Sequence, residues 1–360
     1  MKKLFVLFVA MFIVLTLAAC GGSEVETYEI AMITDAGDID DESFNQGTWE
    51  GIVAYAEENN ISHRYYRPAA VSDADYIATI DLAVSAGAKV VVTPGFLFEV
   101  AIYQAQQDHP DVMFILIDGV PHAGDWDGNI GDNTVSILFA EHESGFLAGY
   151  AAVHDGYTEL GYMGGMAVPA VVRFGVGFVA GALYAANEAG VAISFPNDRY
   201  TYLGDFDAKD SHKNEALAWF NSGTEIIFAA AGGAGSSVMS AAEDSGNKMI
   251  GVDVDQSSIS PTVVTSAMKG LGAAVQQVLA QFYADNFPGG ELLIKNASED
   301  GVALPMDTSR FATFSQAQYD SIHGRIASGA VSVPENYTEL IAFLNAIGQT
   351  TAIVEGTIHP

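Results

Sequence analysis

The stretch YEIAMITDAGDIDDESFNQ, residues 28–46, contains the unit on which the fold prediction depends. Its first seven residues are a short apolar run that is typical of a buried strand. A helical pattern with Trp49 and Ile52 on one face follows over residues 43–59. The residues between the two are mostly acidic. A strand that leads through a polar connection into a helix is the repeating unit of a parallel sheet.

The same unit recurs along most of the chain. Further strands are expected at 89–93, 112–118, 159–164, 200–204, 225–229, 248–253 and 263–265, and further helices at 72–87, 98–108, 171–190, 210–222, 236–246 and 267–287. Such alternation predicts an α/β protein whose mostly parallel sheets are covered by helices on both faces. Because the chain exceeds the length of one ordinary core, we expect two lobes.

The N-terminus predicts export and a lipid anchor. Two lysines precede an apolar run that ends in the small-residue sequence LAAC, whose last residue is Cys20. We expect residues 1–19 to be a signal peptide, Cys20 to be lipidated, and residues 20–27 to tether the fold to the outer face of the cell membrane. Cys20 is the only cysteine, which excludes an intramolecular disulfide and a cysteine zinc site. The alternative is an ordinary signal peptide in which Cys20 is incidental.

Charge and histidine spacing exclude several classes of partner. Asp and Glu number 45 against 14 Lys and Arg, and the resulting net charge of −31 disfavours binding to nucleic acid and to anionic lipid headgroups. The eight histidines have no HxxxH or HxH spacing, so no metal site is expected. We interpret Glu141-His142-Glu143 as a solvated helix start.

The glycine-rich motifs are weak evidence for a cofactor. Gly175, Gly177 and Gly181 form GxGxxxG, which is one residue off the dinucleotide fingerprint and does not directly follow a strand. The segment 232–235 lacks the Gly-Lys-Ser/Thr of a phosphate-binding loop, and no GxSxG motif is present. The sequence therefore predicts no cofactor and no catalytic residue.

Unusual polar residues and glycines follow the predicted strands, where ligands bind in open parallel sheets. Asp35, Asp118, Gly232 and Asp253 each stand at such a position. In a binding interpretation Asp35 accepts hydrogen bonds from a ligand, Phe44 stacks on a flat ring and Asn45 contacts the ring's edge. In a catalytic interpretation the carboxylates hold a divalent cation that activates water. The simplest interpretation of the acidic residues 38–42 is a helix N-terminus that favours negative charge.

A set of motifs resembles one known family. They are DAGDIDDESFNQGTWEG (35–51), GFLFEVAIYQAQQDHPDVMFILIDG (95–119), LFAEHESGFLAGYAA (138–152), GYMGGMAVPAVVRFGVGFVAG (161–181), AAGGAG (230–235), GVDVDQ (251–256) and TSAMKG (265–270). Together, in this order and over residues 28–302, they look like the basic membrane protein family. Its members are lipoproteins of the purine nucleoside receptor type that serve ABC transporters.

The resemblance implies a two-lobed, type I periplasmic-binding-protein fold with a purine nucleoside between the lobes and an ABC transporter permease as partner. We expect lobe 1 at 28–140 and 256–290 and lobe 2 at 141–255 and 291–360, with chain crossings near residues 140, 255 and 290, because the helix predicted over 267–287 returns to the first lobe. The residues that the resemblance assigns to the ligand are Asp35, Phe44, Asn45, Asp118, Phe206, Gly232, Asp253 and Lys269. Phe44 and Phe206 would sandwich the base, Gly232 would let the backbone approach the ribose, and Asp253 would hold its hydroxyls. Phe174 is a second candidate for stacking, but we expect it to pack its helix.

Two other functions stay open. A sugar or another small solute could occupy the same fold. A nucleoside hydrolase is the enzymatic alternative, because residues 34–41 resemble the Asp-Thr-Asp-Pro-Gly-X-Asp-Asp calcium loop of that family. Here Ile33 replaces the leading Asp, the proline is missing and the final Asp pair is displaced by one residue, which disfavours tight Ca²⁺ coordination.

Overall fold

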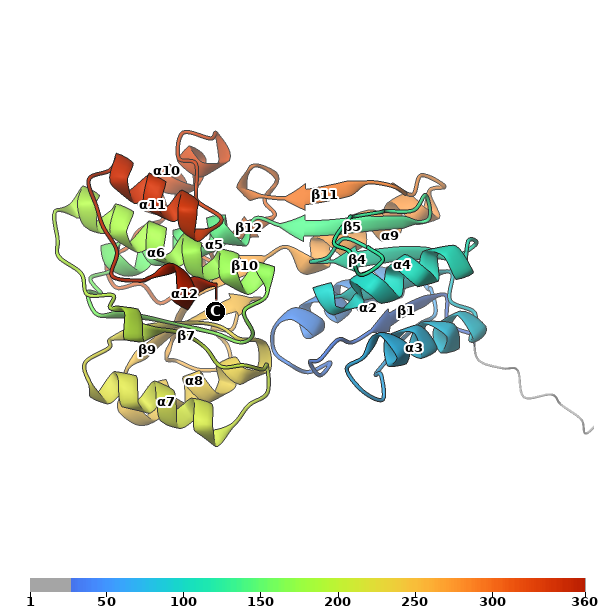
Figure 1. Ribbon diagram of the computed structural model, residues 1–360, viewed down its shortest axis with the longest axis horizontal. Helices are drawn as coiled ribbons and strands as arrows, with labels where there is room; N and C mark the ends of the chain where they lie inside the picture. The colour runs from blue at the N-terminus through green and yellow to red at the C-terminus, as the bar shows by residue number, and fades with distance from the viewer. Residues whose placement is uncertain (1–26, 360) are drawn as a thin grey trace, which may run out of the picture.

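A computed structural model describes residues 27–359, so the predicted signal peptide and Cys20 lie outside the described residues. Figure 1 shows two lobes side by side, each built on a six-stranded sheet. The first sheet contains β1 (Ile30–Ile33), β2 (His63–Tyr66), β3 (Val90–Pro94), β4 (Met113–Ile117), β5 (Thr134–Phe139) and β11 (Leu292–Lys295). The second contains β6 (Leu160–Gly164), β7 (Tyr200–Tyr202), β8 (Ile226–Ala230), β9 (Lys248–Asp253), β10 (Val263–Lys269) and β12 (Val302–Ala303).

The two sheets have the same topology. Their strand orders are β11-β5-β4-β3-β1-β2 and β12-β10-β9-β8-β6-β7, so each strand of one lobe has a counterpart in the other. All pairs are parallel except β10 with β12, which is antiparallel. The predicted α/β class with two lobes of mostly parallel strands is therefore confirmed.

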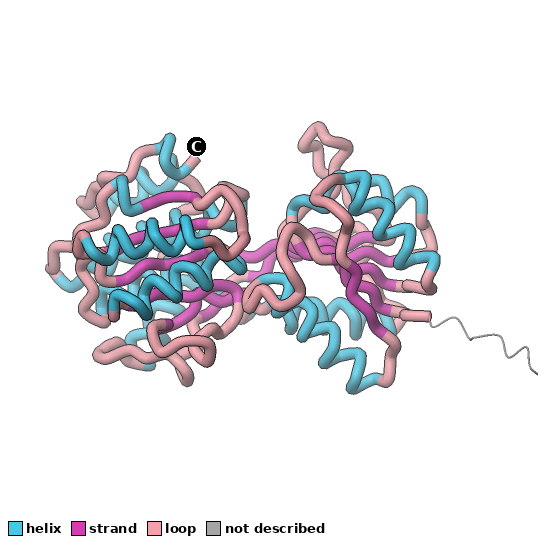
Figure 2. Tube along the Cα trace, turned by 90° about the horizontal axis from the view of Figure 1, so that it is seen from below, coloured by secondary structure: helices cyan, strands magenta, loops and turns pink. Residues whose placement is uncertain are grey.

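Helices cover both faces of each sheet (Figure 2). In the first lobe α2 (Phe44–Asn59) and α9 (Leu271–Tyr283) pack together on one face, and α3 (Asp73–Ser85) and α4 (Glu99–Asp108) cover the other. In the second lobe α5 (Glu141–His154) and α6 (Pro169–Ala189) form one layer, and α7 (Asp210–Asn221) and α8 (Gly235–Ser245) form the other. The C-terminal helices are α10 (Gln316–Ala327) and α11 (Tyr337–Ala346), which pack outside the α5–α6 layer, and α12 (Glu355–Ile358), which contacts both β7 and α6.

The chain passes between the lobes three times, at different places from two of those expected. The first crossing joins β5 to α5 at Ala140, the second joins β10 to α9 at Gly270, and the third joins β11 to β12 over residues 296–301. The expected crossings near 255 and 290 are wrong, because residues 256–269 stay in the second lobe and 291–295 stay in the first.

The helix predicted over 267–287 explains why the second crossing was expected near 255 and not at Gly270. Ala267 and Met268 continue strand β10 and pair with Val252 and Asp253 of β9. The helix begins only at Leu271, beyond the crossing. Ala, Met and Lys favour helices in isolation, and only the neighbouring strand shows that they extend the sheet here.

Glycines allow α5 and α6 to approach each other closely. A Cβ atom on Gly145 of α5 would lie 2.2 Å from the carbonyl oxygen of Phe174, and one on Gly177 of α6 would lie 1.9 Å from that of His142. Helix α6 is long and apolar enough to cross a membrane, but 78% of its apolar window is buried inside the protein, as in a core helix. The glycine motif in residues 175–181 therefore serves helix packing, since it lies inside α6 and not after a strand.

Replacement of Gly177 by Ala should destabilise the protein. The added methyl group cannot fit without separating two packed backbones, so we expect Gly177→Ala to lower the free energy of unfolding by about 1–3 kcal/mol. Gly324 of α10 is the matched control, because a Cβ atom there meets nothing within 4 Å. Gly324→Ala should stabilise the protein by roughly 0.5–1 kcal/mol. Urea unfolding of both variants checks the prediction, and equal effects would contradict it.

Candidate functional site

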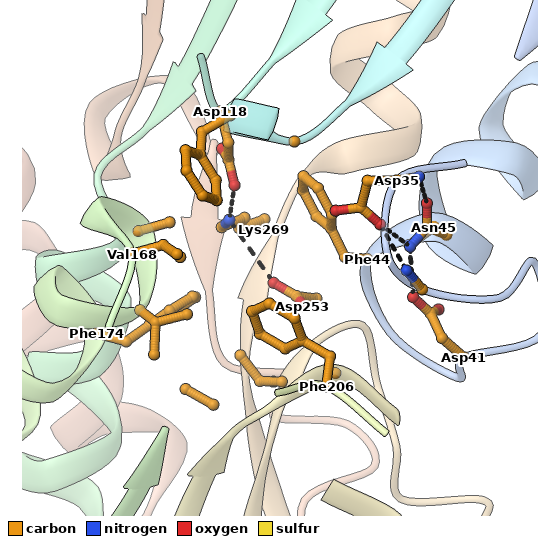
Figure 3. A pocket seen from close by; sticks show the side chains of 18 of the residues that line it. Asp35, Asp41, Phe44, Asn45, Asp118, Val168, Phe174, Phe206, Asp253 and Lys269 are labelled. Atoms are coloured by element: carbon orange, nitrogen blue, oxygen red, sulfur yellow. Dashed lines mark hydrogen bonds and ion pairs between the residues drawn. The ribbon is translucent and has the colours of Figure 1, made fainter. Parts of the chain in front are cut away.

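A pocket opens between the lobes at the carboxyl ends of the strands, and we call it the inter-lobe pocket (Figure 3). All eight ligand residues that the resemblance assigned line it. Its first-lobe wall is formed by Asp35, Gly37, Asp41, Phe44, Asn45, Gly95, Phe96 and Asp118. Its second-lobe wall is formed by Val168, Pro169, Ala170, Val171, Phe174, Phe206, Ala230, Gly232, Gly233, Val252, Asp253 and Lys269.

A network of acceptors and amides holds the first-lobe wall in place. Asn45 donates from Nδ2 to Asp35 Oδ1 at 3.0 Å and to Asp41 Oδ2 at 2.9 Å. Asp41 also accepts from the backbone amides of Ser43, Asn45 and Gln46, so it caps the N-terminus of α2. Of the acidic run 38–42, this is the residue that acts as the helix-terminal anion. Burial raises the pKa of Asp35 to about 6 despite hydrogen bonds from Gly37 and Asn45.

Aromatic rings enter the inter-lobe pocket from both lobes. Phe44, the first residue of α2, and Phe206, in the loop after β7, project into it from opposite sides (Figure 3). Two glycines make room for Phe206. A Cβ atom on Gly165 would lie 2.4 Å from its ring, and one on Gly232, whose φ is +52°, would lie 3.4 Å away. Phe174 packs within α6, as expected, and also lines the pocket.

The two strand-end aspartates occupy equivalent places in the two lobes. Asp118 follows β4 and Asp253 ends β9, and these strands are counterparts in the two sheets. Both residues have left-handed backbones, with φ of +57° and +65°. Asp tolerates this conformation better than most residues, and residues held in it cluster at functional sites.

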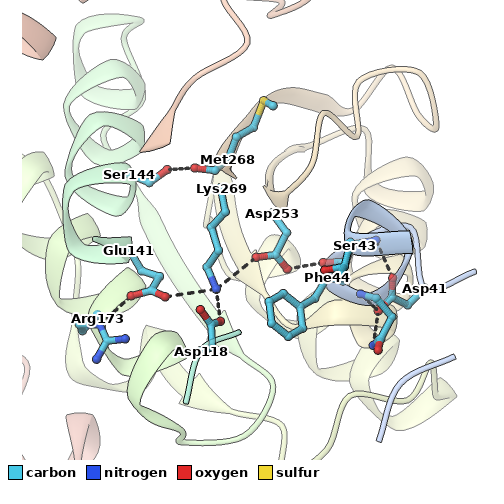
Figure 4. Close-up of polar contacts among 12 residues, drawn as sticks. Asp41, Ser43, Phe44, Asp118, Glu141, Ser144, Arg173, Asp253, Met268 and Lys269 are labelled. Carbon is cyan, nitrogen blue, oxygen red and sulfur yellow. Dashed lines mark hydrogen bonds and ion pairs between the residues drawn. The ribbon is translucent and has the colours of Figure 1, made fainter. Parts of the chain in front are cut away.

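Lys269 connects the two lobes at the base of the pocket (Figure 4). Its side chain is 2% exposed, and its Nζ is paired with Asp118 Oδ2 from the first lobe. The same atom lies 3.2 Å from Glu141 Oε1 and 3.8 Å from Asp253 Oδ1 in the second lobe. Nζ also lies 4.8 Å from the ring centroid of Phe44 and 5.4 Å from that of Phe174. The ammonium group is thus surrounded by carboxylates and aromatic faces, and both stabilise a buried cation.

The pKa values in this cluster follow from burial and charge. Burial alone would lower the pKa of Lys269, but Asp118, Glu141 and Asp253 outweigh it and raise that pKa above its usual range. Burial raises the pKa of Asp118 to about 7, although Lys269 opposes the shift. Burial also raises the pKa of Asp253. Glu141 differs, because Lys269 and Arg173 together overcome burial and hold its pKa below the usual value.

Glu141 is the carboxylate beside Lys269 that was not predicted from the sequence. It is fully buried, receives a 2.6 Å hydrogen bond from Arg173 Nε and lies beside Lys269, so the prediction of a solvated helix start is wrong for it. The sequence held one signal. Arg173 stands inside the apolar helical run 171–182, and an arginine there requires a buried acidic partner.

Comparison with known proteins identifies the family. Residues 28–337 match the Bmp family, described as PnrA-like substrate-binding proteins of ABC transporters. The chain belongs to the Bmp family. Its relatives include the ABC transporter nucleoside-binding protein BmpA of Lactococcus lactis, 32% identical over 324 residues that cover 82% of this chain and 87% of that protein. Basic membrane protein A of Borreliella burgdorferi is 27% identical over 328 residues, covering 90% of this chain and 92% of that protein.

Solved structures with the same two-lobed fold include proteins of ABC transporter systems. A solute-binding protein of an ABC transporter system from Aeropyrum pernix superimposes with a TM-score of 0.76, covering 89% of this chain and 97% of that one at 21% identity. The Bmp family match ends at residue 337, so nearly all of α11 and the whole of α12 lie beyond it. The chain is therefore a substrate-binding protein of an ABC transporter.

Removal of Glu141 should lower the free energy of unfolding more than removal of a surface carboxylate does. Glu141→Ala leaves Arg173 and Lys269 buried with less compensating charge, and we expect the free energy of unfolding to fall by about 3–5 kcal/mol. Glu335 is the matched control, since its carboxylate is 55% exposed and lies 3.8 Å from His142 Nε2. Glu335→Ala should change stability by less than about 1 kcal/mol. Similar unfolding midpoints for the two variants in urea would contradict this role for Glu141.

Proposed function

We propose that this substrate-binding protein captures a purine nucleoside in the inter-lobe pocket and delivers it to the permease of an ABC transporter. The observation that carries the proposal is the pair of aromatic side chains, Phe44 and Phe206, that enter one pocket from opposite lobes. Stacking on an aromatic ring contributes about 1–3 kcal/mol per base, and it suits a flat heterocycle better than a sugar alone. The relative BmpA of Lactococcus lactis is named a nucleoside-binding protein.

The polar groups of the pocket suit a neutral ligand that donates hydrogen bonds. Asp118 Oδ1 is buried and has no hydrogen-bond partner among the described residues, and buried acceptors are rarely left so. Asp35 and Asp253 add two further buried carboxylates. Ribose hydroxyls and base N–H groups can donate to these oxygens. A phosphate group would be repelled by them, which favours a nucleoside over a nucleotide.

We further propose that the protein is held at the outer face of the cell membrane by lipid on Cys20. The support is the LAAC sequence after a basic and apolar leader. A lipid anchor there would keep the binding lobes beside the permease, with residues 20–27 as the tether.

The hydrolase alternative finds little support in the first-lobe loop. Both oxygens of Asp41 accept hydrogen bonds at the start of α2, and Asp35 Oδ1 accepts from Gly37 and Asn45. These carboxylates therefore brace the loop instead of converging on a cation. Over residues 27–359 no group of three or more His, Cys, Asp and Glu residues is placed to hold a metal ion.

Calorimetric titration of the soluble form, residues 23–360, tests the proposal. We expect inosine, guanosine or adenosine to bind stoichiometrically with submicromolar affinity, with or without Ca²⁺, and to be recovered intact. Cytidine and ribose should bind more weakly because they offer less ring surface for stacking. Release of ribose from the nucleoside would instead support the hydrolase, and binding of ribose alone would support a sugar receptor.

Phe44→Ala separates stacking from general damage to the fold. The variant should weaken purine nucleoside binding by about 1–3 kcal/mol. Tyr65→Ala is the matched control, because Tyr65 is 41% exposed on β2 and does not line the inter-lobe pocket. It should leave the dissociation constant unchanged. An unchanged constant for Phe44→Ala as well would show that Phe44 is not a stacking platform.

Nucleoside affinity should fall at acidic pH. A carboxylate that accepts from the ligand must be ionised, and the pKa values of Asp35 and Asp118 are raised to about 6 and about 7. Binding should therefore be strongest above pH 7 and weaken as the pH falls through 7 to 5, where the native carboxyls take up protons. Asp35→Asn should make the slope of log Kd against pH shallower, because one titrating group is lost. A constant Kd from pH 8 to pH 5 would exclude both carboxylates as acceptors.

A further inference from the structure

Phe206 depends on a strand with few partners of its own. It lies four residues beyond β7, which has three residues, stands at the edge of the second sheet and pairs only with β6. Such a short edge strand supplies little restraint for a ring that must keep its place in the inter-lobe pocket. In the structure a distant segment of the chain contacts this strand.

Residues 353–358, which we call the C-terminal brace, bind both ends of β7. Before the strand, Asn197 Oδ1 accepts hydrogen bonds from Val354 N at 3.0 Å and from Thr357 Oγ1 at 2.9 Å. At its end, the hydroxyl of Tyr202 donates to the carbonyl oxygen of Ile358 at 2.9 Å. Ile353 and Ile358 are at most 1% exposed and anchor the brace in the core. Figure 1 shows α12, the last helix of the brace, beside β7.

The contacts continue from Tyr202 to the ligand pocket. The ring of Tyr202 lies against Gly164, where a Cβ atom would come within 2.7 Å of it. The next two amides, of Leu203 and Gly204, donate to the carbonyl oxygens of Gly164 and Gly165 at 2.9 Å each. Gly165 is also the glycine against which the ring of Phe206 packs. The brace, the end of β7 and Phe206 are thus joined by consecutive direct contacts.

We propose that the C-terminal brace is a positioning element for the ligand site, which holds the loop after β7 so that Phe206 faces the base. This inference rests on the proposed nucleoside function. The brace lies beyond residue 337, where the match to the Bmp family model ends, so the matched residues do not include this support for Phe206. Tyr202 and Asn197 act as positioning residues, because they touch the brace and not the pocket.

The first test needs no ligand. Hydrogen exchange is measured on the protein, on a variant lacking residues 354–360 and on Tyr202→Phe, which loses the hydroxyl that bonds Ile358 and that also lies 3.3 Å from the hydroxyl of Tyr200. We expect faster exchange of the Leu203 and Gly204 amides in both variants, with the amide of Gly95, which donates to Ile117 in the first lobe, unchanged. Gln349→Ala is the matched control. This variant removes a hydrogen bond from the C-terminal segment to Asn187 of α6, away from β7. It should leave the exchange rates of the Leu203 and Gly204 amides unchanged.

The second test uses inosine and ribose as probes. In the deletion variant the dissociation constant of inosine should rise roughly threefold to tenfold, while that of ribose stays the same because ribose offers no base to Phe206. In a Phe206→Ala background the same deletion should cause no further loss for inosine, since the brace acts through that ring. A purely structural role would instead weaken both probes and add to the effect of Phe206→Ala.

The outcomes distinguish failure of the proposed role of the C-terminal brace from failure of the proposed nucleoside function. Unchanged exchange at Leu203 and Gly204 in the deletion variant overturns the proposal, whatever the protein binds. Faster exchange with an unchanged inosine constant overturns the positioning role. Faster exchange in a protein whose intact form binds no nucleoside supports the brace and refutes the nucleoside function.

Discussion

A single buried ammonium group sets the constraint on which the rest of the site depends. Lys269 is the last residue of β10, directly before the second crossing, and Glu141 is the first residue after the first crossing. A cation buried there is stable only with carboxylates around it, and they come from both lobes as Asp118, Glu141 and Asp253. The ion cluster therefore fixes the crossing segments and the polar base of the inter-lobe pocket together. Arg173 extends the cluster into α6, whose first turns form part of the pocket wall.

The repeated topology explains why the site is lined symmetrically. Because β4 and β9 are counterparts, their ends place Asp118 and Asp253 on either side of Lys269. Likewise β3 and β8 are counterparts, and they are followed by the positive-φ glycines Gly95 and Gly232 in the pocket wall. The glycines after β3 and β8 leave space in the pocket, and the aspartates at the ends of β4 and β9 supply negative charge. The lobes differ in their aromatic residues, since Phe44 begins a helix and Phe206 sits on a loop.

Most of the strands and most of the polar residues of the pocket could be predicted from the sequence, for a physical reason. The carboxyl ends of parallel strands meet at one edge, so Asp35, Asp118, Gly232 and Asp253 could be brought together without knowing the strand order. What failed depends on distant partners. Strands β2, β5 and β11 were not predicted, and β11 extends the first sheet only because β5 lies beside it. Glu141 has the pattern of an exposed helix start, and nothing local shows that its helix begins against a lysine 128 positions later.

Lobe closure and ring placement are physically linked through Asp253. Its Oδ2 accepts a 2.5 Å hydrogen bond from Ser43 Oγ in the opposite lobe, while its Oδ1 faces Lys269. Ser43 directly precedes Phe44, and the neighbouring carbonyl of Glu42 accepts a 2.8 Å hydrogen bond from Gln256 Nε2, again across the lobes. These contacts fix the start of α2 against the second lobe, and with it the ring of Phe44. Opening the lobes must break them and withdraw that ring from Lys269. A hinge motion that separated the lobes would therefore move Phe44 and expose the ion cluster in the same movement.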